Sequence, residues 1–338
     1  MVSEREVLSE NAASADETLS DEMLSVDTVM ADGTGVLPVS PVQRPRKKVD
    51  KEEIAGTLFA CIPLVGFLIF GFVPMLLALA MAFLNMYDWT FDGVTWAGWD
   101  NFARGFEDPV FWDSVGNTFI LGSSVLFSQL FALIIAYFLN MDIKGKKTFR
   151  MIYFVPYVCS TVAVTLMWKY MFNTNYGIIN QMLGRTGDNA IQWLGDSAYF
   201  SWAVIIMSVW SGMGYGIILY MAALTSVDKS MVEAATIDGA GSFKCFWSIV
   251  LPSISPTSFY LLVTGVIGAL QAFATTNVLA SNGGPNNDGV TMVFYLYRMM
   301  FNYYDPGRAA ASAWFLAIII LAITGIQFFV SKRWVNYD

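Results

Sequence analysis

Residues 226–256 read SVDKSMVEAATIDGAGSFKCFWSIVLPSISP, a long polar passage between two strongly apolar stretches. The passage predicts a short amphipathic helix, a glycine break, a second short helix and the start of the next apolar stretch. Ser230 and Glu233 have the spacing of a capping box, in which the hydroxyl and the carboxylate each accept a hydrogen bond from a free backbone N–H. We therefore expect the first helix to begin near Ser230.

Glycines and prolines divide the rest of this passage. Gly239 and Gly241 lie between the two predicted helices, where a residue without a Cβ permits a tight turn. Pro252 and Pro256 cannot continue a helical hydrogen-bond ladder, and they suit the first turn of a helix. Small side chains such as Ala234 leave one face of the first helix open to close approach by another protein.

The spacing of the passage also resembles a motif of known transporters. Glu233 is followed by Gly239 six positions later and by Ile249 ten positions after that, which is similar to the EAA loop of ABC-importer permeases. The resemblance implies a cytoplasmic coupling helix that docks on a separate ATPase subunit. The positions that it assigns to coupling are Glu233, Ala234, Ala235, Asp238, Gly239, Ala240 and Pro252.

The composition is that of a membrane protein. Of the 338 residues, 56% are hydrophobic and 14% are charged, whereas soluble domains carry about 25% charged residues. Histidine is absent and the three cysteines are widely spaced. The sequence thus offers neither the usual general base nor a disulfide or metal framework. We expect no catalytic residue and no metal site in this chain.

The net charge of −8 arises in residues 1–43, which hold nine of the 27 acidic side chains and one of the 19 basic ones. This segment has no sustained apolar period, which is typical of disorder. A basic collar follows it, made of Arg44, Arg46, Lys47, Lys48 and Lys51. We therefore divide the chain into a disordered acidic cytoplasmic tail with its collar over 1–50 and a membrane domain over 51–338. The tail is either a solvated extension or a regulatory segment.

Six apolar stretches follow, each near or above the ~20 residues that a helix needs to cross a bilayer. They lie at 54–86, 119–140, 151–171, 202–224, 258–280 and 310–330. The first is long enough to tilt or to begin at the membrane interface. The sequence thus predicts an all-α membrane protein with six transmembrane helices.

Lysine and arginine predict the orientation of these helices. Thirteen of them lie in the basic collar, the loop at 142–150, the passage at 226–256 and the C-terminus, and five lie in or near the loops on the other side. Basic residues concentrate on the cytoplasmic side of a membrane. We therefore expect both termini and the 226–256 passage to be cytoplasmic.

Further motifs extend the resemblance over roughly residue 54 to the end. They are WDNF at 99–102, FW at 111–112, GNT at 116–118, FR and FVPYV within 149–158, WKYMFN at 168–173, GIIN at 177–180 and GGP at 283–285. In this order they resemble the sugar-importer permeases of the maltose and multiple-sugar type. Two features depart from that pattern: the acidic tail, and Asp228, near which the family usually has a proline.

The resemblance implies a type I ABC-importer permease in a bacterial or archaeal cell membrane. Such a subunit forms half of the path for a sugar or oligosaccharide and works with a sister permease, a dimer of ABC ATPases and an extracytoplasmic solute-binding protein. ATP and Mg²⁺ are bound by the ATPase partner. The resemblance therefore implies that this chain has no cofactor of its own, is not an enzyme and has no nucleic-acid partner.

Candidate residues for the sugar path lie in the fourth and fifth apolar stretches. Ser208, Gly212 and Tyr215 recur at i, i+4 and i+7 on one helix face, and they match positions that line the path in a maltose-type permease. The fifth stretch adds polar side chains at Gln271, Thr275 and Asn277. Hydroxyls, amides and aromatic faces suit a neutral sugar. Small and polar residues also mediate packing between transmembrane helices, so each position has both interpretations.

Other functions fit the sequence less well. A secondary carrier is expected to have paired halves with interrupted helices and coupling charges in the membrane, and the sequence shows neither. A membrane enzyme needs a nucleophile with a base or a metal, for which no pattern is found. An importer of amino acids or phosphate would favour charged groups inside the apolar stretches, where they are scarce. The sequence thus favours a neutral solute, without identifying the sugar.

Overall fold

The computed structural model describes residues 51–86, 93–141 and 144–336. The acidic tail predicted over 1–50, with all of its basic collar except Lys51, lies outside the described residues. The chain divides into two units, Met1–Leu64 and Val65–Asp338, and each is described by itself. In the first unit, the described part is the beginning of helix α2 (Lys51–Phe67), which has Pro63 in its interior.

Apolar helices long enough to cross a membrane are the main elements. Within the described residues there are four, and two bent helix pairs raise the number to six if each pair is one span. The four are Leu58–Ala82, Pro109–Asn140, Ser197–Ser226 and Pro306–Ser331. The first contains the π-helical turn η1 (Leu68–Phe72) and helix α3 (Val73–Ala82). The second is made of α5 (Pro109–Gly122) and α6 (Ser124–Asn140). The prediction of an all-α chain is confirmed.

The stretch predicted as one helix over 151–171 is broken. Its two halves, α7 (Lys146–Val158) and α8 (Thr161–Met171), meet at an angle of 102°. Pro156 lies in the last turn of α7, where its missing N–H weakens the helical ladder, and Cys159 and Ser160 leave the helical conformation with ψ of 150° and 130°. The predicted span over 151–171 is therefore bent at this point.

The helix predicted over 258–280 has other bounds in the structure and is also bent. The helix starts earlier, through α12 (Ser242–Cys245), the π-helical turn η3 (Phe246–Val250) and α13 (Leu251–Ser253), and it bends by 65° before α14 (Ser255–Leu270). Pro252 and Pro256 lie in the first turns of α13 and α14, as expected. After Leu270 the chain leaves the helix and forms a separate short helix, α15 (Ala274–Leu279). Thr291 Oγ1 donates to the freed carbonyl of Ala272 at 2.8 Å, which satisfies a group that the helix can no longer pair.

Helix α10 (Ser197–Ser226) is the centre of the second unit, and it packs on α6 and α7. The contact uses small residues: Ala132 and Ala136 of α6 are fully buried, and a Cβ at Gly214 of α10 would collide with the carbonyl oxygen of Tyr153 in α7. Between membrane helices, close backbone approach increases van der Waals contact. Glycine and alanine at these positions therefore hold the three helices together.

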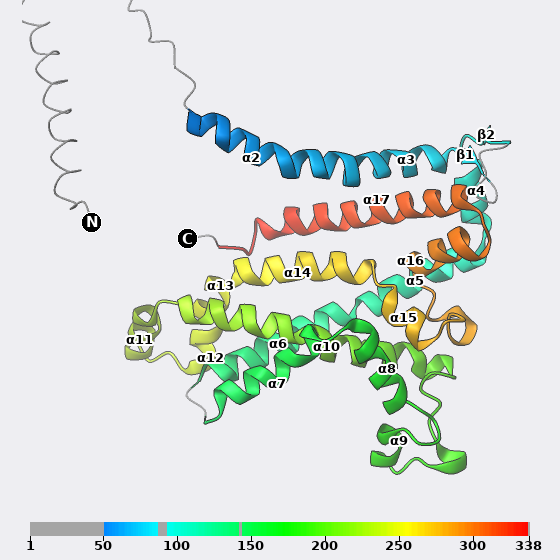
Figure 1. The fold of residues 1–338 in the computed structure, drawn as a ribbon. Helices are drawn as coiled ribbons and strands as arrows, with labels where there is room; N and C mark the ends of the chain where they lie inside the picture. The colour runs from blue at the N-terminus through cyan, green and yellow to red at the C-terminus, as the bar shows by residue number, and fades with distance from the viewer. Residues whose placement is uncertain (1–50, 87–92, 142–143, 337–338) are drawn as a thin grey trace, which may run out of the picture. The chain divides into compact units, whose positions relative to one another are not determined.

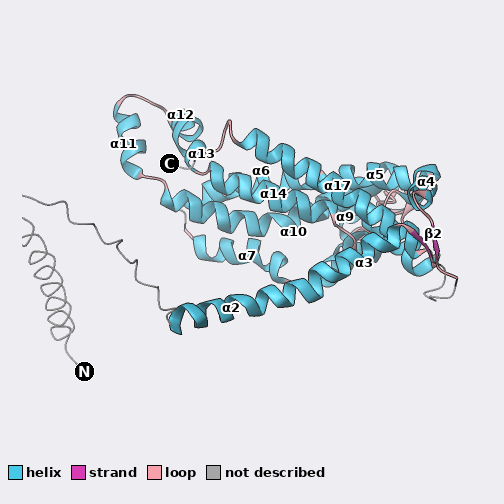
Figure 2. Ribbon diagram, turned by 90° about the horizontal axis from the view of Figure 1, so that it is seen from above, coloured by secondary structure: helices cyan, strands magenta, loops and turns pink. Residues whose placement is uncertain are grey.

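Helix α17 (Pro306–Ser331) packs on α3, α4 (Asp100–Glu107) and α16 (Met292–Tyr297), as Figure 1 shows. The contact again uses small residues, among them the buried Ala82, Ala310 and Ala311. Beside it, β1 (Leu84–Asn85) pairs antiparallel with β2 (Thr95–Trp96). Figure 2 shows α3, α4, α17 and β2 from above.

The remaining described elements are short. They are α9 (Ile178–Met182), η2 (Gly187–Asn189), α11 (Lys229–Ile237), η4 (Pro285–Asn287) and the π-helical turn η5 (Arg298–Asn302). In the second unit, α11 and α12 lie at one end of the helices, and α4, α9 and the two strands lie toward the other (Figures 1 and 2). Two separate places are therefore considered as candidate sites. One is the segment with α11 and α12 at the end of the helices, and the other is a cavity between the helices.

Candidate functional site

Helix α11 is capped by Asp228. Its carboxylate oxygen Oδ1 accepts a hydrogen bond from the backbone N–H of Ser230 at 2.8 Å, and this bond lowers the pKa of Asp228 below its ordinary value. Ser230 is therefore already inside the helix, and the predicted capping box of Ser230 and Glu233 is wrong. Asp is as good an N-cap as Ser, so the earlier residue takes the capping position.

Gly239 ends α11 in a left-handed turn. Its φ is +83°, its N–H donates to the carbonyl of Thr236 at 3.0 Å, and the N–H of Ala240 donates to the carbonyl of Ala235 at 2.9 Å. This pair of hydrogen bonds is a Schellman motif, for which glycine at the left-handed position is strongly preferred. The tight turn predicted at Gly239 is confirmed. Gly241 has φ of −70°, which any residue adopts, so only the first glycine is required by the backbone.

The residues predicted to couple to an ATPase lie in two places. Six of them form one continuous helix and turn, and Pro252 lies apart in α13. Glu233, Ala234, Asp238 and Gly239 are exposed. Large apolar side chains surround them: Ile237 is 86% exposed and Phe243 is 78% exposed. The segment therefore presents an apolar surface at the end of the helix bundle.

A cavity of about 500 Å³ lies between α6, α7, α10, α14 and α15. About half of its lining residues carry a hydroxyl group. These are Ser124, Ser128, Tyr157, Ser208, Ser211, Tyr215, Tyr260, Thr264, Thr275, Thr276 and Thr291. None of the lining residues, all of which belong to the described part of the chain, carries a charge. The cavity can therefore donate and accept hydrogen bonds without an ionic partner.

Three tyrosines from three helices form one wall of the cavity. The rings of Tyr157 and Tyr215 are stacked, with centroids 5.1 Å apart and planes 18° apart. The hydroxyls of Tyr215 and Tyr260 lie 3.2 Å apart. The wall thus offers an aromatic face beside two hydroxyl groups, which matches the apolar faces and hydroxyl edges of a sugar ring.

The predicted path residues divide into two groups. Ser208, Gly212, Tyr215 and Thr275 line the cavity. Gln271 and Asn277 are not among its lining residues, although Ala272, Thr275 and Thr276 beside them are. The chain leaves α14 at Leu270, so Gln271 lies after that helix and Thr275 and Asn277 lie in α15.

Sequence reasoning missed several lining residues. Ser124 and Ser128 had a signal, because they recur at i and i+4 in an apolar stretch and continue into Ala132 and Ala136. This spacing predicts one small-residue face of a helix. Tyr157 and Tyr260 had none, because their pairing with Tyr215 depends on how three distant helices pack.

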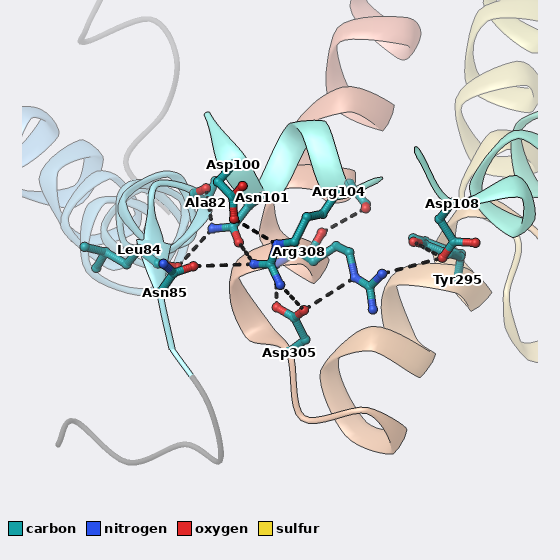
Figure 3. A network of polar contacts seen from close by, with 11 residues as sticks. Ala82, Leu84, Asn85, Asp100, Asn101, Arg104, Asp108, Tyr295, Asp305 and Arg308 are labelled. Carbon is teal, nitrogen blue, oxygen red and sulfur yellow. Dashed lines mark hydrogen bonds and ion pairs between the residues drawn. The ribbon is translucent and has the colours of Figure 1, made fainter. Parts of the chain in front are cut away.

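A network of ion pairs lies at the opposite end from α11. Arg104 of α4 contacts Asp100 and Asp305, and Arg308 of α17 contacts Asp108 and Asp305, with nitrogen–oxygen distances between 3.1 and 3.6 Å. Figure 3 shows these side chains converging from α4, the start of α5 and the start of α17. The network joins parts of the chain that are far apart in sequence.

Amide and phenol groups extend this network. The Asn101 side-chain amide donates to the carbonyls of Ala82 and Leu84, both at 2.9 Å. The Tyr295 hydroxyl donates to Asp108 at 2.8 Å. Burial of Tyr295, together with this hydrogen bond, raises its pKa, so the hydroxyl keeps its proton. These contacts attach the end of α3 and helix α16 to the ion pairs.

The family model described as "Binding-protein-dependent transport system inner membrane component" matches residues 128–336. Among curated relatives, the chain is 34% identical over 297 residues to the probable ABC transporter permease protein YesP of Bacillus subtilis, covering 86% of this chain and 95% of that one. It is 30% identical over 289 residues to the lactose transport system permease protein LacF of Rhizobium radiobacter, covering 83% of this chain and 95% of that one.

A solved structure shares the fold. It is a bacterial alginate ABC transporter in complex with an alginate pentasaccharide-bound periplasmic protein, and one of its chains matches with a TM-score of 0.73 and 26% identity over 84% of this chain and 96% of that one. The fold is therefore the type I ABC-importer permease fold predicted from the sequence, and the chain is a multi-pass membrane protein. By its sequence and its fold, this chain belongs to the family of inner-membrane components of binding-protein-dependent transport systems.

Proposed function

We propose that this chain is a permease subunit that imports a neutral sugar or oligosaccharide through the 500 Å³ cavity. The observation that carries the proposal is the lining, in which hydroxyls and tyrosine faces are combined with no charged group. Sugars bind through many neutral hydrogen bonds and through contacts with aromatic faces. The similarity to a lactose permease supports the same solute class.

A charged solute is the main alternative. The similar solved importer carries alginate, an acidic polysaccharide, and an anion would gain from arginine or lysine in the path. The described lining offers hydroxyls and one amide in place of such groups. The cavity of this chain therefore favours a neutral solute over an anionic one.

Coupling to ATP hydrolysis is assigned to the segment from Asp228 to Pro252. Its exposed Ile237 and Phe243 give a partner an apolar surface, and the capped helix α11 is a rigid element for that partner to move. We assign the partner to a dimer of ATPases that binds ATP and Mg²⁺, so that this chain needs no cofactor and catalyses no reaction itself. A sister permease supplies the other half of the path, and an extracytoplasmic binding protein delivers the solute.

The proposed cycle is a rigid-body switch. When the ATPases close, they draw the two coupling segments together and rock the helices, so that the cavity changes from inward to outward access around one fixed site. The 65° bend between α13 and α14 transmits this motion, since it joins the coupling segment to a cavity-lining helix. Both termini and α11 are assigned to the cytoplasm because the basic residues concentrate there.

Identification of the solute and the partners tests the proposal. The tagged chain is purified with its co-eluting proteins, and the binding protein is screened by thermal shift against neutral mono- and oligosaccharides, with glycerol phosphate and alginate fragments as anionic probes. We expect ATPase and sister permease to co-elute and a neutral sugar to raise the melting temperature. Stabilisation by the anionic probes alone contradicts the neutral-sugar proposal.

Leucine substitutions at Thr275 and Asn277, both in α15, test the role of the cavity. Thr275 lines the cavity and Asn277, two residues away in the same short helix, does not. We expect Thr275→Leu to lower sugar uptake strongly, because it removes a hydroxyl and adds apolar volume, while Asn277→Leu changes uptake little. Both variants are compared at equal membrane abundance. A larger loss in Asn277→Leu would show that the solute takes another path.

A further inference from the structure

Gln129 of α6 lines the 500 Å³ cavity described above, here called the central cavity, and also a second cavity. The second cavity has a volume of about 340 Å³. Among the residues that the structure describes, Gln129 is the one that lines both cavities. Its side chain therefore forms part of the boundary between them.

The second cavity lies on the side of the coupling segment. Leu251 and Pro252 of α13 form part of its wall, together with Trp334 near the C-terminus. A solute that leaves the central cavity past Gln129 thus moves toward the end of the bundle that carries α11. With the orientation proposed above, this direction is the cytoplasmic one.

The amide of Gln129 occupies space left by two glycines. A Cβ at Gly216 of α10 would lie 3.1 Å from Gln129 Oε1 and 2.8 Å from the Cβ of Ala132. A Cβ at Gly265 of α14 would lie 3.7 Å from Gln129 Nε2 and 2.9 Å from a methyl group of Val125. Helices α10 and α14 therefore leave room for this one amide between them.

The carbonyl oxygen of this amide is without a donor. Gln129 Oε1 is buried and accepts no hydrogen bond from the described residues. A buried acceptor that stays unpaired costs free energy, and a passing hydroxyl group can supply the missing hydrogen. Because this oxygen is buried against α10, the side chain must turn its amide toward the cavity to present the oxygen to a solute.

We propose that Gln129 contacts the transported sugar at the inner boundary of the cavity and contributes to its specificity; this inference rests on the proposed import function. Oε1 accepts a hydrogen bond from a sugar hydroxyl, and Nε2 donates one to a ring or glycosidic oxygen. A carboxylate or phosphate can accept from Nε2 but has no hydrogen to give to Oε1, so the amide offers an anion one kind of hydrogen bond and a sugar hydroxyl two.

The first test compares two buried glutamines in the complete importer. Gln327 of α17 also has a buried carbonyl oxygen with no donor among the described residues, but it lines neither cavity. We expect Gln129→Leu to lower the maximal rate of sugar uptake by about tenfold, the loss of one hydrogen bond to a polar partner, at unchanged membrane abundance. Gln327→Leu is expected to stay within about twofold of wild type. Equal losses in the two variants overturn the proposal.

The second test needs no identified sugar, so it separates this inference from the proposed function. Gln129→Cys and Gln327→Cys are made without the native cysteines and treated, in the assembled importer, with the water-soluble thiol reagent sulfonatoethyl methanethiosulfonate. We expect Gln129→Cys to react at least about tenfold faster, since it borders a polar cavity. Equal or slower labelling of Gln129→Cys overturns the inference, whatever solute is transported. The two proposals can fail separately. If the wild-type importer takes up no sugar, the proposed function is wrong. Fast labelling of Gln129→Cys in the same importer would still place Gln129 on the transport path.

Discussion

Arg104 donates a hydrogen bond to Asp305 across 3.2 Å, although the two residues are 201 positions apart in the chain. Asp305 is 8% exposed in its side chain and also pairs with Arg308. The last membrane helix begins at the next residue, Pro306. This one carboxylate therefore ties the start of α17 to α4, and Asn101 extends the connection to the end of α3.

We expect Asp305→Asn to destabilise the permease by roughly 2–3 kcal/mol, between the values for exposed and fully buried ion pairs. Asparagine retains the oxygen that accepts from the Arg308 N–H, so the change removes charge and keeps the helix cap. The control is Asp100→Asn, which removes a pair to the same Arg104 at a side chain that is 57% exposed, and which should cost less than about 1 kcal/mol. The measurement is thermal unfolding in detergent. Equal shifts for the two variants would contradict the role of Asp305.

The parts of the fold that were predictable from sequence are those that depend on neighbouring residues. A continuous apolar stretch is enough to predict a membrane helix, and Gly239 and Pro252 act on their own turns. The bend after α7 was not predicted, because 151–171 is apolar enough to form one span, and Pro156 with the polar Ser160 and Thr161 is the local sign of a break. The early start of α5 was missed because Asp113 and Asn117 interrupt the apolar pattern, although Asp108 caps a continuous helix there.

The cavity was also predictable only in part, because its lining comes from helices that are far apart in the sequence. Ser208, Gly212 and Tyr215 share one helix face, so their spacing revealed them. Gln271 and Asn277 lie beyond the end of α14 and do not line the cavity, and near this end Thr291 donates to the Ala272 carbonyl. Such a contact between distant residues leaves no pattern in the local sequence.

Topology gives a second prediction. Asp188 in η2 and Ser242 at the start of α12 are both exposed, and the excess of basic residues assigns them to opposite sides of the membrane. Single cysteines at these positions, without the three native ones, should label differently in intact cells. An impermeant maleimide is expected to react with Asp188→Cys and not with Ser242→Cys. The reverse pattern would invert the orientation and remove the coupling segment from the cytoplasm.

The acidic tail gives a third prediction, from sequence alone. Residues 2–40 have no apolar residues at core spacing and precede the basic collar, so we expect their deletion to leave sugar uptake unchanged per molecule in the membrane. Uptake is normalised to the amount of permease found by immunoblot. A loss of uptake beyond any loss of abundance would show that the tail takes part in transport or its regulation.

The cap of α11 gives a fourth prediction that separates Asp228 from Ser230. We expect Asp228→Ala to weaken ATPase recovery, because the Ser230 N–H loses its acceptor, and Asp228→Asn to retain it, since Asn is an equally good N-cap. Ser230→Ala should cost less than Asp228→Ala, because it keeps the N–H and removes only the hydroxyl that also favours the ionised Asp228 carboxylate. Co-purification of the ATPase measures all three. A loss in Ser230→Ala with none in Asp228→Ala would restore the capping box.

The stabilisation of α11 by the Asp228 carboxylate depends on pH in a defined direction. The hydrogen bond lowers the pKa of Asp228 in the folded state below the ordinary value of 3.8. Its stabilisation is therefore fully present above that value and is lost as the pH falls through the lowered folded pKa. Near neutral pH, we expect no change in ATPase recovery from this carboxylate. A loss between pH 8 and pH 5 that Asp228→Asn abolishes would be inconsistent with the lowered pKa.

The last prediction uses two exposed glycines, Gly239 after the end of α11 and Gly241 at the N-cap of α12, which differ in backbone conformation. Gly239 has φ of +83° and Gly241 has φ of −70°, and neither has an atom within 4 Å of an added Cβ. A side chain at Gly239 therefore meets no clash in the free permease and costs only the roughly 1–2 kcal/mol of a left-handed residue. That cost is small against the stability of the helix bundle, but it is enough to misdirect the turn that ends α11. We expect Gly239→Asp to remain in the membrane while ATPase recovery and uptake collapse. Gly241→Asp, which adds the same charge two residues away, should retain most of both; normal recovery and transport in Gly239→Asp would remove the case for this segment as the coupling element.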